Sequence, residues 1–574
     1  MALSRHSMLI RMKKFLSKYA SLLLTLAFGL MVFLFWRFRY PFALTYQEQL
    51  QMFLFDSDYF FGRMAEPGGF ARYLAEFLVQ LYNGVTIGAL ILALLYMLLQ
   101  RLTWRLMKTE RGYYLLSFIP TIILWYAMGD ENVMLTYVVA LVLAIAATLG
   151  WRRLSCALWV KWVLALLLIP VLYLLLGPVV LLVAVLMLPF PVAIPAVVYA
   201  LALMLLSAHY LPFPMSRIIL GISYYRVPEV IPYSLMAVLL VIALLALFSR
   251  KLPQPKRWMV YAQAVVVALL LIVPQKFGFD TRKYDLIEYD HLVRVNDWNS
   301  IIRKAEKQMP DLPMSVSATN LALGMTNQLG ERAFDFYQRG TQGLLPKFER
   351  NFATSQLTGE IYFHLGLVNT AQRFAFESME AIPNYNKSAR VVKRLAETNL
   401  INGQYEVARK YLQMLEKTVF YRPWAQRTMA MLGDEKAINA HPLYGTLRQY
   451  RLQEDLLFSE RELDKICGQL FMHNPQNMMA AQYLLMMPLL DKDVPRFMQY
   501  VQAVQNRIQY NPRSCQEAIA FAFMQQGQQP PQGIVNQLTL QQMNDFARIY
   551  SGNKESSELE RFRNTVWYYL MAGQ

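Results

Sequence analysis

The sequence has few charged residues, cysteines and histidines. Only 17% of its 574 residues are Asp, Glu, Lys or Arg and 56% are hydrophobic, whereas soluble domains have about 25% charged and 45–50% apolar residues. A chain that is water-soluble throughout, disordered or collagen-like is therefore excluded. Three cysteines, Cys156, Cys467 and Cys515, are too few for a disulfide framework or a metal–thiolate cluster, although pairing of Cys467 with Cys515 stays open. The six histidines show no metal-binding spacing, so we expect no protein-built zinc site.

Positive charge is concentrated in the first half of the chain. The net charge is +17, and residues 1–275 contain 22 Lys and Arg against 9 Asp and Glu, whereas residues 276–574 contain 34 against 30. A basic excess among apolar segments is what the orientation of membrane helices requires. The charge therefore indicates a membrane protein, and we expect no nucleic-acid partner.

Long apolar runs in residues 1–275 predict about nine transmembrane helices. Six runs are long enough to cross a bilayer, near residues 19–38, 81–100, 113–128, 133–150, 232–248 and 259–273. The first is too long, and too aromatic at its end, for a cleaved signal peptide. Residues 154–216 contain seven prolines and only one charged residue, Lys161, which suits three further passes. These prolines fit either helix ends in short loops or broken helices that line a cavity.

Four basic clusters predict the orientation of this domain. They lie before the first apolar run, after the second, after the fourth and before the last, and include Lys13, Arg101, Arg152 and Lys256. Because Lys and Arg of short loops stay on the cytoplasmic side, we expect an inner (cytoplasmic) membrane protein whose N-terminus is cytoplasmic. Residues 276–574 would then be periplasmic.

Seven of the charged residues in the opposite loops form the candidate site: Glu48, Asp56, Asp58, Asp130, Glu131, Arg217 and Arg226. A carboxylate can accept a proton from a hydroxyl or hold a divalent cation, and a guanidinium can bind a lipid phosphate bidentately. The alternative is that all seven are solvated loop charges. The stretch TYQEQLQMFLF in the first of these loops also predicts an amphipathic helix at the membrane interface.

Residues 276–574 predict a soluble domain of helix pairs. The segment RVVKRLAETNLINGQYEVARKYLQMLEKT is typical of two helices joined at Gly403. Leu–Gly or Leu–Ala pairs begin at residues 323, 365 and 395, spacings that bracket the period of about 34 residues of tetratricopeptide repeats. We therefore predict an α-solenoid that binds a protein or peptide along its concave face. His364 falls in a predicted helix and suits packing better than catalysis.

Two resemblances rest on these segments. The stretches HLVRVNDWNSIIRKAEKQMPDLPMSVSATNLAL and RLAETNLINGQYEVA resemble an uncharacterised family of bacterial integral membrane proteins with tetratricopeptide-like C-termini. The order of a first span, a long acidic loop, many short spans and an outer soluble domain is similar to that of GT-C glycosyltransferases, in particular the transmembrane O-mannosyltransferases with tetratricopeptide repeats. The second resemblance implies a polyprenyl-phosphate sugar donor and a catalytic acid in the first outer loop, which here is Asp56 or Asp58.

The sequence thus predicts an all-α protein with two domains. Residues 1–275 would form a GT-C-like polytopic membrane domain of about nine spans, and residues 276–574 a periplasmic α-solenoid of tetratricopeptide-like helix pairs. The expected partners are membrane lipid, the lipid-linked donor, and a protein or peptide on the solenoid. A divalent cation is a candidate cofactor.

Two functions from different classes stay open. The first is a glycosyltransferase that transfers a sugar from a polyprenyl-phosphate donor to a protein or glycan at the outer membrane face. Its catalytic acids would be Asp56 and Asp58, and the other five candidates would bind substrate. The second is a non-enzymatic, membrane-anchored scaffold for envelope protein assembly. Because an anchor needs only one span, many spans favour the enzyme.

Overall fold

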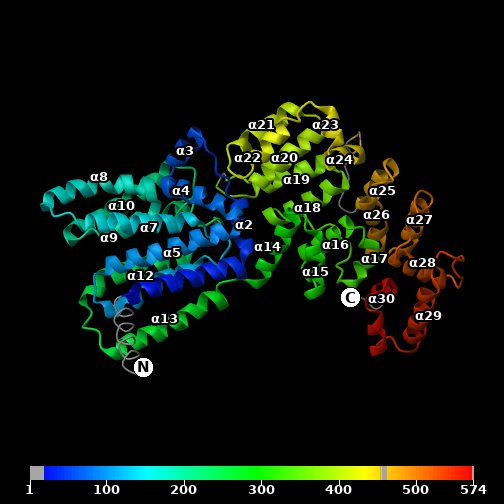
Figure 1. The fold of residues 1–574 in the computed structure, drawn as a ribbon, viewed down its shortest axis with the longest axis horizontal. Coiled ribbons are helices and arrows are strands. Elements are labelled where there is room, and N and C mark those ends of the chain that lie inside the picture. Colours follow the sequence, from blue (N-terminus) through cyan, green and yellow to red (C-terminus); the bar gives the residue numbers. More distant parts are fainter. Residues whose placement is uncertain (1–18, 385, 453, 455–461, 572–574) are drawn as a thin grey trace, which may run out of the picture. The chain divides into compact units, whose positions relative to one another are not determined.

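The computed structural model describes residues 19–384, 386–452, 454 and 462–571. Every regular element within these ranges is a helix (Figure 1), which confirms the prediction of an all-α protein. The chain divides into two compact units. The first contains the residues up to Tyr284 together with two later loop segments, Pro383–Ser388 and Lys417–Phe420, and the second contains the rest.

Six helices of the first unit are long and apolar enough to cross a membrane. They are Tyr19–Arg39, α5 (Val85–Met107), Leu158–Val185, α10 (Phe190–Tyr210), Tyr233–Lys251 and α13 (Arg257–Phe277). A helix pairs all its backbone polar groups internally, as the hydrocarbon core of a bilayer demands. Large apolar side chains such as Leu240 and Leu269 remain exposed on these helices, as expected of a surface that lipid covers. The first unit is therefore that of a multi-pass membrane protein.

Two shorter apolar helices, α6 (Ile119–Ala127) and α7 (Leu135–Trp151), complete the packing of this unit. α7 packs against α5, and α6 packs against α12 (Tyr233–Phe248). A third short helix, α9 (Val180–Val185), is the last part of the candidate span Leu158–Val185. For these reasons six helices, and not the predicted nine, are long enough by themselves to cross a bilayer.

The prolines occupy three kinds of position. Pro191 lies at the start of α10, as predicted for helix ends, whereas Pro170 and Pro195 lie inside long helices, which neither alternative predicted. Pro178 lies in a one-turn break, η4 (Gly177–Val179), that separates α8 (Leu158–Leu176) from α9. Gly177 has φ +75° there, and a Cβ at this position would lie 3.0 Å from the Tyr224 hydroxyl. The break therefore needs glycine.

Hydrogen bonds bring basic segments of the first unit to one end of its helices. Arg152, directly after α7, donates to the carbonyl of Leu106 at 2.5 Å and to that of Ala246 at 3.3 Å. These carbonyls lie near the ends of α5 and α12, whose following loops contain further Lys and Arg residues. The loops with the candidate residues lie at the other ends of the same helices.

The first of those loops differs from the sequence prediction. Instead of an amphipathic helix at the interface, α2 (Pro41–Gln49) has six of its nine residues buried. Its polar side chains are accommodated inside the unit, where Gln47 Nε2 donates to the carbonyl of Val133 at 3.3 Å. Polar periodicity alone does not distinguish an interfacial helix from a helix buried against polar partners.

The second unit contains antiparallel helix pairs. Among them, α18 (Phe352–Leu365) packs against α19 (Val368–Glu380), and α20 (Ala389–Ile401) packs against α21 (Tyr405–Glu416). Gly403 occupies the turn of the second pair with φ +76°, which confirms the helix pair and the turn that the sequence predicted there. Cys467 and Cys515 are buried in this unit as free thiols.

A buried ionic cluster links α18 to α20. Glu360 lies 2.6 Å from Arg394 and 3.7 Å from Arg390. Burial by itself would raise the pKa of Glu360, but the two guanidinium groups outweigh it and lower the pKa to about 2. His364, one turn further along α18, is buried in contact with Trp298, and burial lowers its pKa to about 4.

Acidification is expected to destabilise the second unit through His364. Its folded pKa of about 4 lies below the ordinary histidine value of 6.5, so the unfolded chain takes up a proton first. Stability is therefore complete above about pH 6.5 and falls as the pH drops toward 4, by up to about 3 kcal/mol. Thermal unfolding of the detergent-solubilised chain should show a shallower pH dependence in His364→Gln. The exposed His473→Gln should keep the wild-type slope, and equal slopes in all three proteins would contradict the assignment.

Candidate functional site

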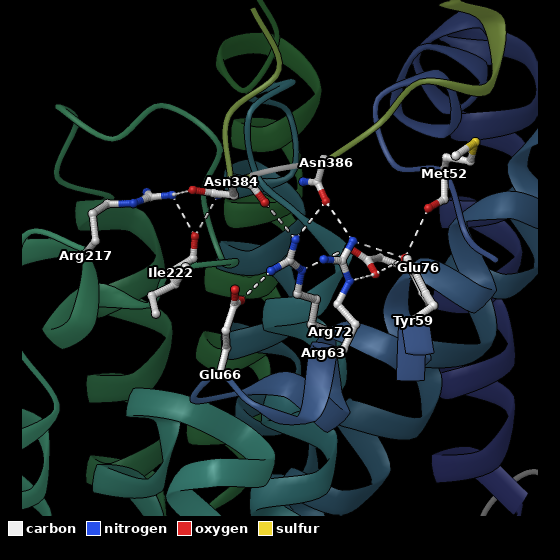
Figure 2. Close-up of polar contacts among 10 residues, drawn as sticks. All are labelled: Met52, Tyr59, Arg63, Glu66, Arg72, Glu76, Arg217, Ile222, Asn384 and Asn386. Carbon is white, nitrogen blue, oxygen red and sulfur yellow. Dashed lines mark hydrogen bonds and ion pairs between the residues drawn. The ribbon is translucent and has the colours of Figure 1, made fainter. Parts of the chain in front are cut away.

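A buried ion-pair network joins α3 (Ser57–Met64) to α4 (Gly69–Val79) (Figure 2). Its centre is Glu76, whose side chain is 0% exposed and accepts hydrogen bonds from Arg63 Nε at 2.8 Å and from Arg72 Nε at 3.0 Å. Tyr59 donates its hydroxyl to the same carboxylate at 2.5 Å, and Arg72 Nη1 lies 2.6 Å from Glu66. Burial, and then Glu76, raise the pKa of Tyr59, so this phenol stays a donor. Each charged group of this network thus has an oppositely charged partner.

The loop segment Pro383–Ser388 completes the network with amide groups. Arg72 Nη2 donates to Asn386 Oδ1 at 2.8 Å and to the Asn384 carbonyl at 3.0 Å. Arg63 Nη2 reaches the same Asn386 oxygen at 3.3 Å, and Arg217 Nη2 reaches Asn384 Oδ1 at 3.3 Å (Figure 2). Three arginines thus hold two asparagines that lie more than 160 residues away in the sequence.

The two predicted catalytic acids lie at the start of α3. Asp56 is the N-cap residue, and its Oδ2 lies 3.2 Å from Lys417 Nζ in the second loop segment of this unit. The side chain of Asp56 is 26% exposed, so an acceptor hydroxyl can reach it. Asp58 lies in the first turn of the helix and is exposed. Both carboxylates therefore lie at the N-terminal end of a helix.

Asp130 and Glu131 meet the loop that contains Arg226. Asp130 accepts a hydrogen bond from the Tyr225 hydroxyl at 2.5 Å, and Glu131 pairs with Lys283 at 3.0 Å. Arg226 Nη1 donates to the backbone carbonyl of Glu131 at 3.0 Å. The Nε and Nη2 atoms of Arg226 are buried and have no hydrogen-bond partner within the described ranges. Burial lowers the pKa of this guanidinium.

Arg217 cross-links its own loop. It lies on α11 (Met215–Leu220), and its Nη2 donates to the carbonyls of Ile222 and Tyr225, both at 2.7 Å. Burial lowers the pKa of Arg217, and Glu229 counteracts this in part. The structure therefore brings Asp130, Glu131, Arg217 and Arg226 together in two hydrogen-bonded loops.

Glu48 occupies a different environment from the other candidates, because it is buried in α2 with an exposed fraction of 5%. Four network residues, in turn, are not among the seven candidates: Arg63, Glu66, Arg72 and Glu76. One signal for them exists in the sequence, since Arg72 and Glu76 stand four residues apart in the apolar segment GFARYLAEFLV, the spacing of an intrahelical ion pair. Nothing comparable marks Asn384 or Asn386. Within the described ranges no group of three or more His, Cys, Asp or Glu side chains could hold a metal ion.

Comparison with known proteins identifies a family but no activity. No curated protein and no solved structure matches the sequence. A family model described as a family of unknown function, DUF6057, matches residues 16–573. Because this match covers nearly the whole sequence, the chain belongs to the DUF6057 family.

Proposed function

We propose that this protein is a membrane glycosyltransferase that transfers a sugar from a polyprenyl-phosphate donor to a protein or glycan acceptor. The observation that carries the proposal is that Arg226 is a buried cation with unpaired nitrogen atoms. The residue is 6% exposed, and its Nε and Nη2 atoms have no hydrogen-bond partner among the residues described. An uncompensated buried charge costs several kcal/mol. The Nε–Nη2 edge is the one that binds two oxygens of an oxyanion side by side. In a multi-pass membrane protein, a lipid phosphate supplies such oxygens.

The carboxylates supply the second part of the reaction. As the acceptor oxygen forms its bond to the anomeric carbon, the bond from that carbon to the phosphate oxygen breaks, and the phosphate leaves with the electron pair. The acceptor proton passes to a carboxylate, which must lie within about 2.6–3.2 Å of the hydroxyl. We assign this role to Asp56 or Asp58. Arg217 and Arg226 balance the charge of the leaving phosphate, and Glu48, Asp130 and Glu131 complete substrate binding.

A transfer assay tests the proposal directly. The purified chain in nanodiscs is incubated with a panel of polyprenyl-phosphate sugars and with acceptor peptides and glycans, and released polyprenyl phosphate is measured by chromatography. Release that depends on the acceptor is the expected result. No release with any donor, from protein that remains folded, would overturn the proposal.

We extend the proposal to topology and architecture. η3 (Arg111–Phe118) with α6 would supply one further pass and α7 a second, and the break at η4 would divide the candidate span Leu158–Val185 into two passes, which gives nine in total. This leaves the basic loops in the cytoplasm and the second unit, as a tetratricopeptide-like solenoid, on the periplasmic side of the cytoplasmic membrane. In a variant without native cysteines, a membrane-impermeant maleimide should label Lys554→Cys in the second unit on intact spheroplasts. It should leave Lys108→Cys unlabelled until the cells are lysed. The reverse pattern would refute this orientation.

A scaffold for envelope protein assembly is the second candidate function. A polar pocket of about 610 Å³ in the second unit favours it, with Arg513, Glu517 and Asn536 among its lining residues. Glu517 is already held by Arg513 at 2.8 Å and by the Val566 amide at 2.8 Å, so the pocket walls are preorganised for a peptide. On this function, loss of the carboxylates of Asp56 and Asp58 would leave the protein fully active in cells.

A further inference from the structure

An apolar groove of about 300 Å³ lies in the first unit, between α7, η4, α9, α11 and α12. Its inner wall is buried, with Leu182 4% exposed and Tyr224 3% exposed. Its rim is open, because Met236 is 47% exposed and Leu240 is 60% exposed. The groove is therefore closed on one side and accessible from the other.

The walls of the groove offer no free polar group to an occupant. Its only side-chain hydroxyls belong to Tyr137 and Tyr224. Tyr137 donates to the carbonyl of Leu235 at 2.5 Å, and Tyr224 donates to the carbonyl of Leu176. A polar ligand would lose its hydration without compensation, whereas a hydrocarbon chain has no polar group that would be left unpaired against these walls. The chemistry of the walls selects a hydrocarbon chain.

The groove belongs to helices that cross the membrane. Met236 and Leu240 lie on the candidate span Tyr233–Lys251, and Pro178 and Leu182 lie on the candidate span Leu158–Val185. The exposed rim is therefore lipid-facing. A chain that enters the groove comes from the bilayer and not from water.

A positive charge lies on the same short helix as one wall of the groove. α11 lines the groove with Ile219 and Leu220 and also carries Arg217. Only Nη2 of Arg217 is used in holding its loop. Nε and Nη1 have no partner among the residues that the structure describes, so this guanidinium can bind an oxyanion while it stays fixed by backbone carbonyls. A cation beside an apolar groove complements a phosphate attached to a hydrocarbon chain.

We propose that the groove binds the hydrocarbon chain of a polyprenyl phosphate and that Arg217 binds its phosphate. The inference rests on the proposed function, since this lipid would be the carrier part of the sugar donor. It adds to the proposed function where the carrier lipid binds and which residues recognise it. The hydrocarbon chain contacts Pro178, Leu182, Tyr224, Met236 and Leu240, and the Nε edge of Arg217 selects the charged phosphate.

Photo-crosslinking tests this site without any transfer reaction. The full chain in phosphatidylcholine nanodiscs is incubated with a polyprenyl phosphate that carries a diazirine in its chain, and the labelled peptides are mapped by mass spectrometry. We expect the label on α9, α11 and α12. Ala243→Trp, which fills the groove, should lower labelling about tenfold or more. Leu244→Trp, on the same helix but outside the groove and 44% exposed, should leave labelling unchanged.

The head group is tested in a second arm. Arg217→Gln should lower the labelling by polyprenyl phosphate about tenfold or more and leave the weaker labelling by the diazirine polyprenol unchanged. Equal labelling of Ala243→Trp and wild type, or equal competition by excess phosphatidylglycerol and polyprenyl phosphate, would overturn the inference. Labelling without transfer would support the groove and count against the proposed function. Transfer without groove labelling would refute the groove and leave the function standing.

Discussion

Replacing Asp56 with asparagine should lower the rate of sugar transfer by about 10²–10⁴-fold, the loss typical of removing a general base. Asparagine has nearly the shape of aspartate but accepts no proton at neutral pH. It is also as good an N-cap residue as aspartate, and the Asp56 side chain makes no capping hydrogen bond to α3, so this helix should still form. The rate is measured as release of polyprenyl phosphate, and folding is checked by the thermal unfolding midpoint.

Two further variants locate the base. Asp58→Asn is measured in parallel, because Asp58 is exposed on the same helix turn. Lys417→Gln removes the cation that lies 3.2 Å from Asp56 and should change the rate far less than loss of the carboxylate. Arg226→Ala should first weaken donor binding, which appears as a raised KM. If Asp56 and Asp58 can both be changed with the full rate retained, they are solvated loop charges and the scaffold becomes the better function.

Glu76→Gln should destabilise the folded protein by about 3–5 kcal/mol, the cost of removing one partner from a buried ion pair. Glu76 neutralises both Arg63 and Arg72, and its own side chain is 0% exposed. An amide in its place leaves two buried guanidinium groups without a shared anion, and it turns an NH₂ group toward donors. The thermal unfolding midpoint of the detergent-solubilised chain measures the loss.

A neighbouring carboxylate provides the control for this prediction. Glu66 also pairs with Arg72, at 2.6 Å, but its side chain is 23% exposed. In Glu66→Gln, water can therefore replace part of the lost interaction with Arg72. The expected decrease in the free energy of unfolding is clearly smaller than that for Glu76→Gln. Equal midpoints for both variants and wild type would show that the network adds no stability.

The sequence predicts the helices well because their causes are local. Apolar runs such as Val85–Met107 and the turn at Gly403 are each specified by neighbouring residues. The spacing of the Arg72–Glu76 pair is also visible within one helix, although no sequence-based prediction rests on it. The amphipathic helix predicted from TYQEQLQMFLF is the exception, because the partners that bury it lie far away in the sequence.

The assembled site depends on contacts that no local pattern encodes. Arg226 meets the carbonyl of Glu131 across 95 residues, and Arg72 meets Asn386 across 314. Asparagine in a loop is ordinarily a turn residue, so nothing distinguishes Asn386 from the many asparagines that only contact water. The burial of α2 also depends on a distant contact, because the carbonyl of Val133, which accepts a hydrogen bond from Gln47, lies in a loop 86 residues away.

The late loop segments of the first unit affect its biosynthesis. The helices up to Tyr284 leave the ribosome first, but the unit also needs Pro383–Ser388 and Lys417–Phe420. At about 5–20 residues per second, translation from Tyr284 to Phe420 takes roughly 7–27 s. During that interval Arg63 and Arg72 have Glu76 but lack the oxygens of Asn384 and Asn386. The first unit is therefore completed only after its helices have been inserted into the membrane. A nonsense codon shortly after Tyr284 would yield inserted helices that lack these loop segments, which quality-control proteases can recognise as incompletely folded.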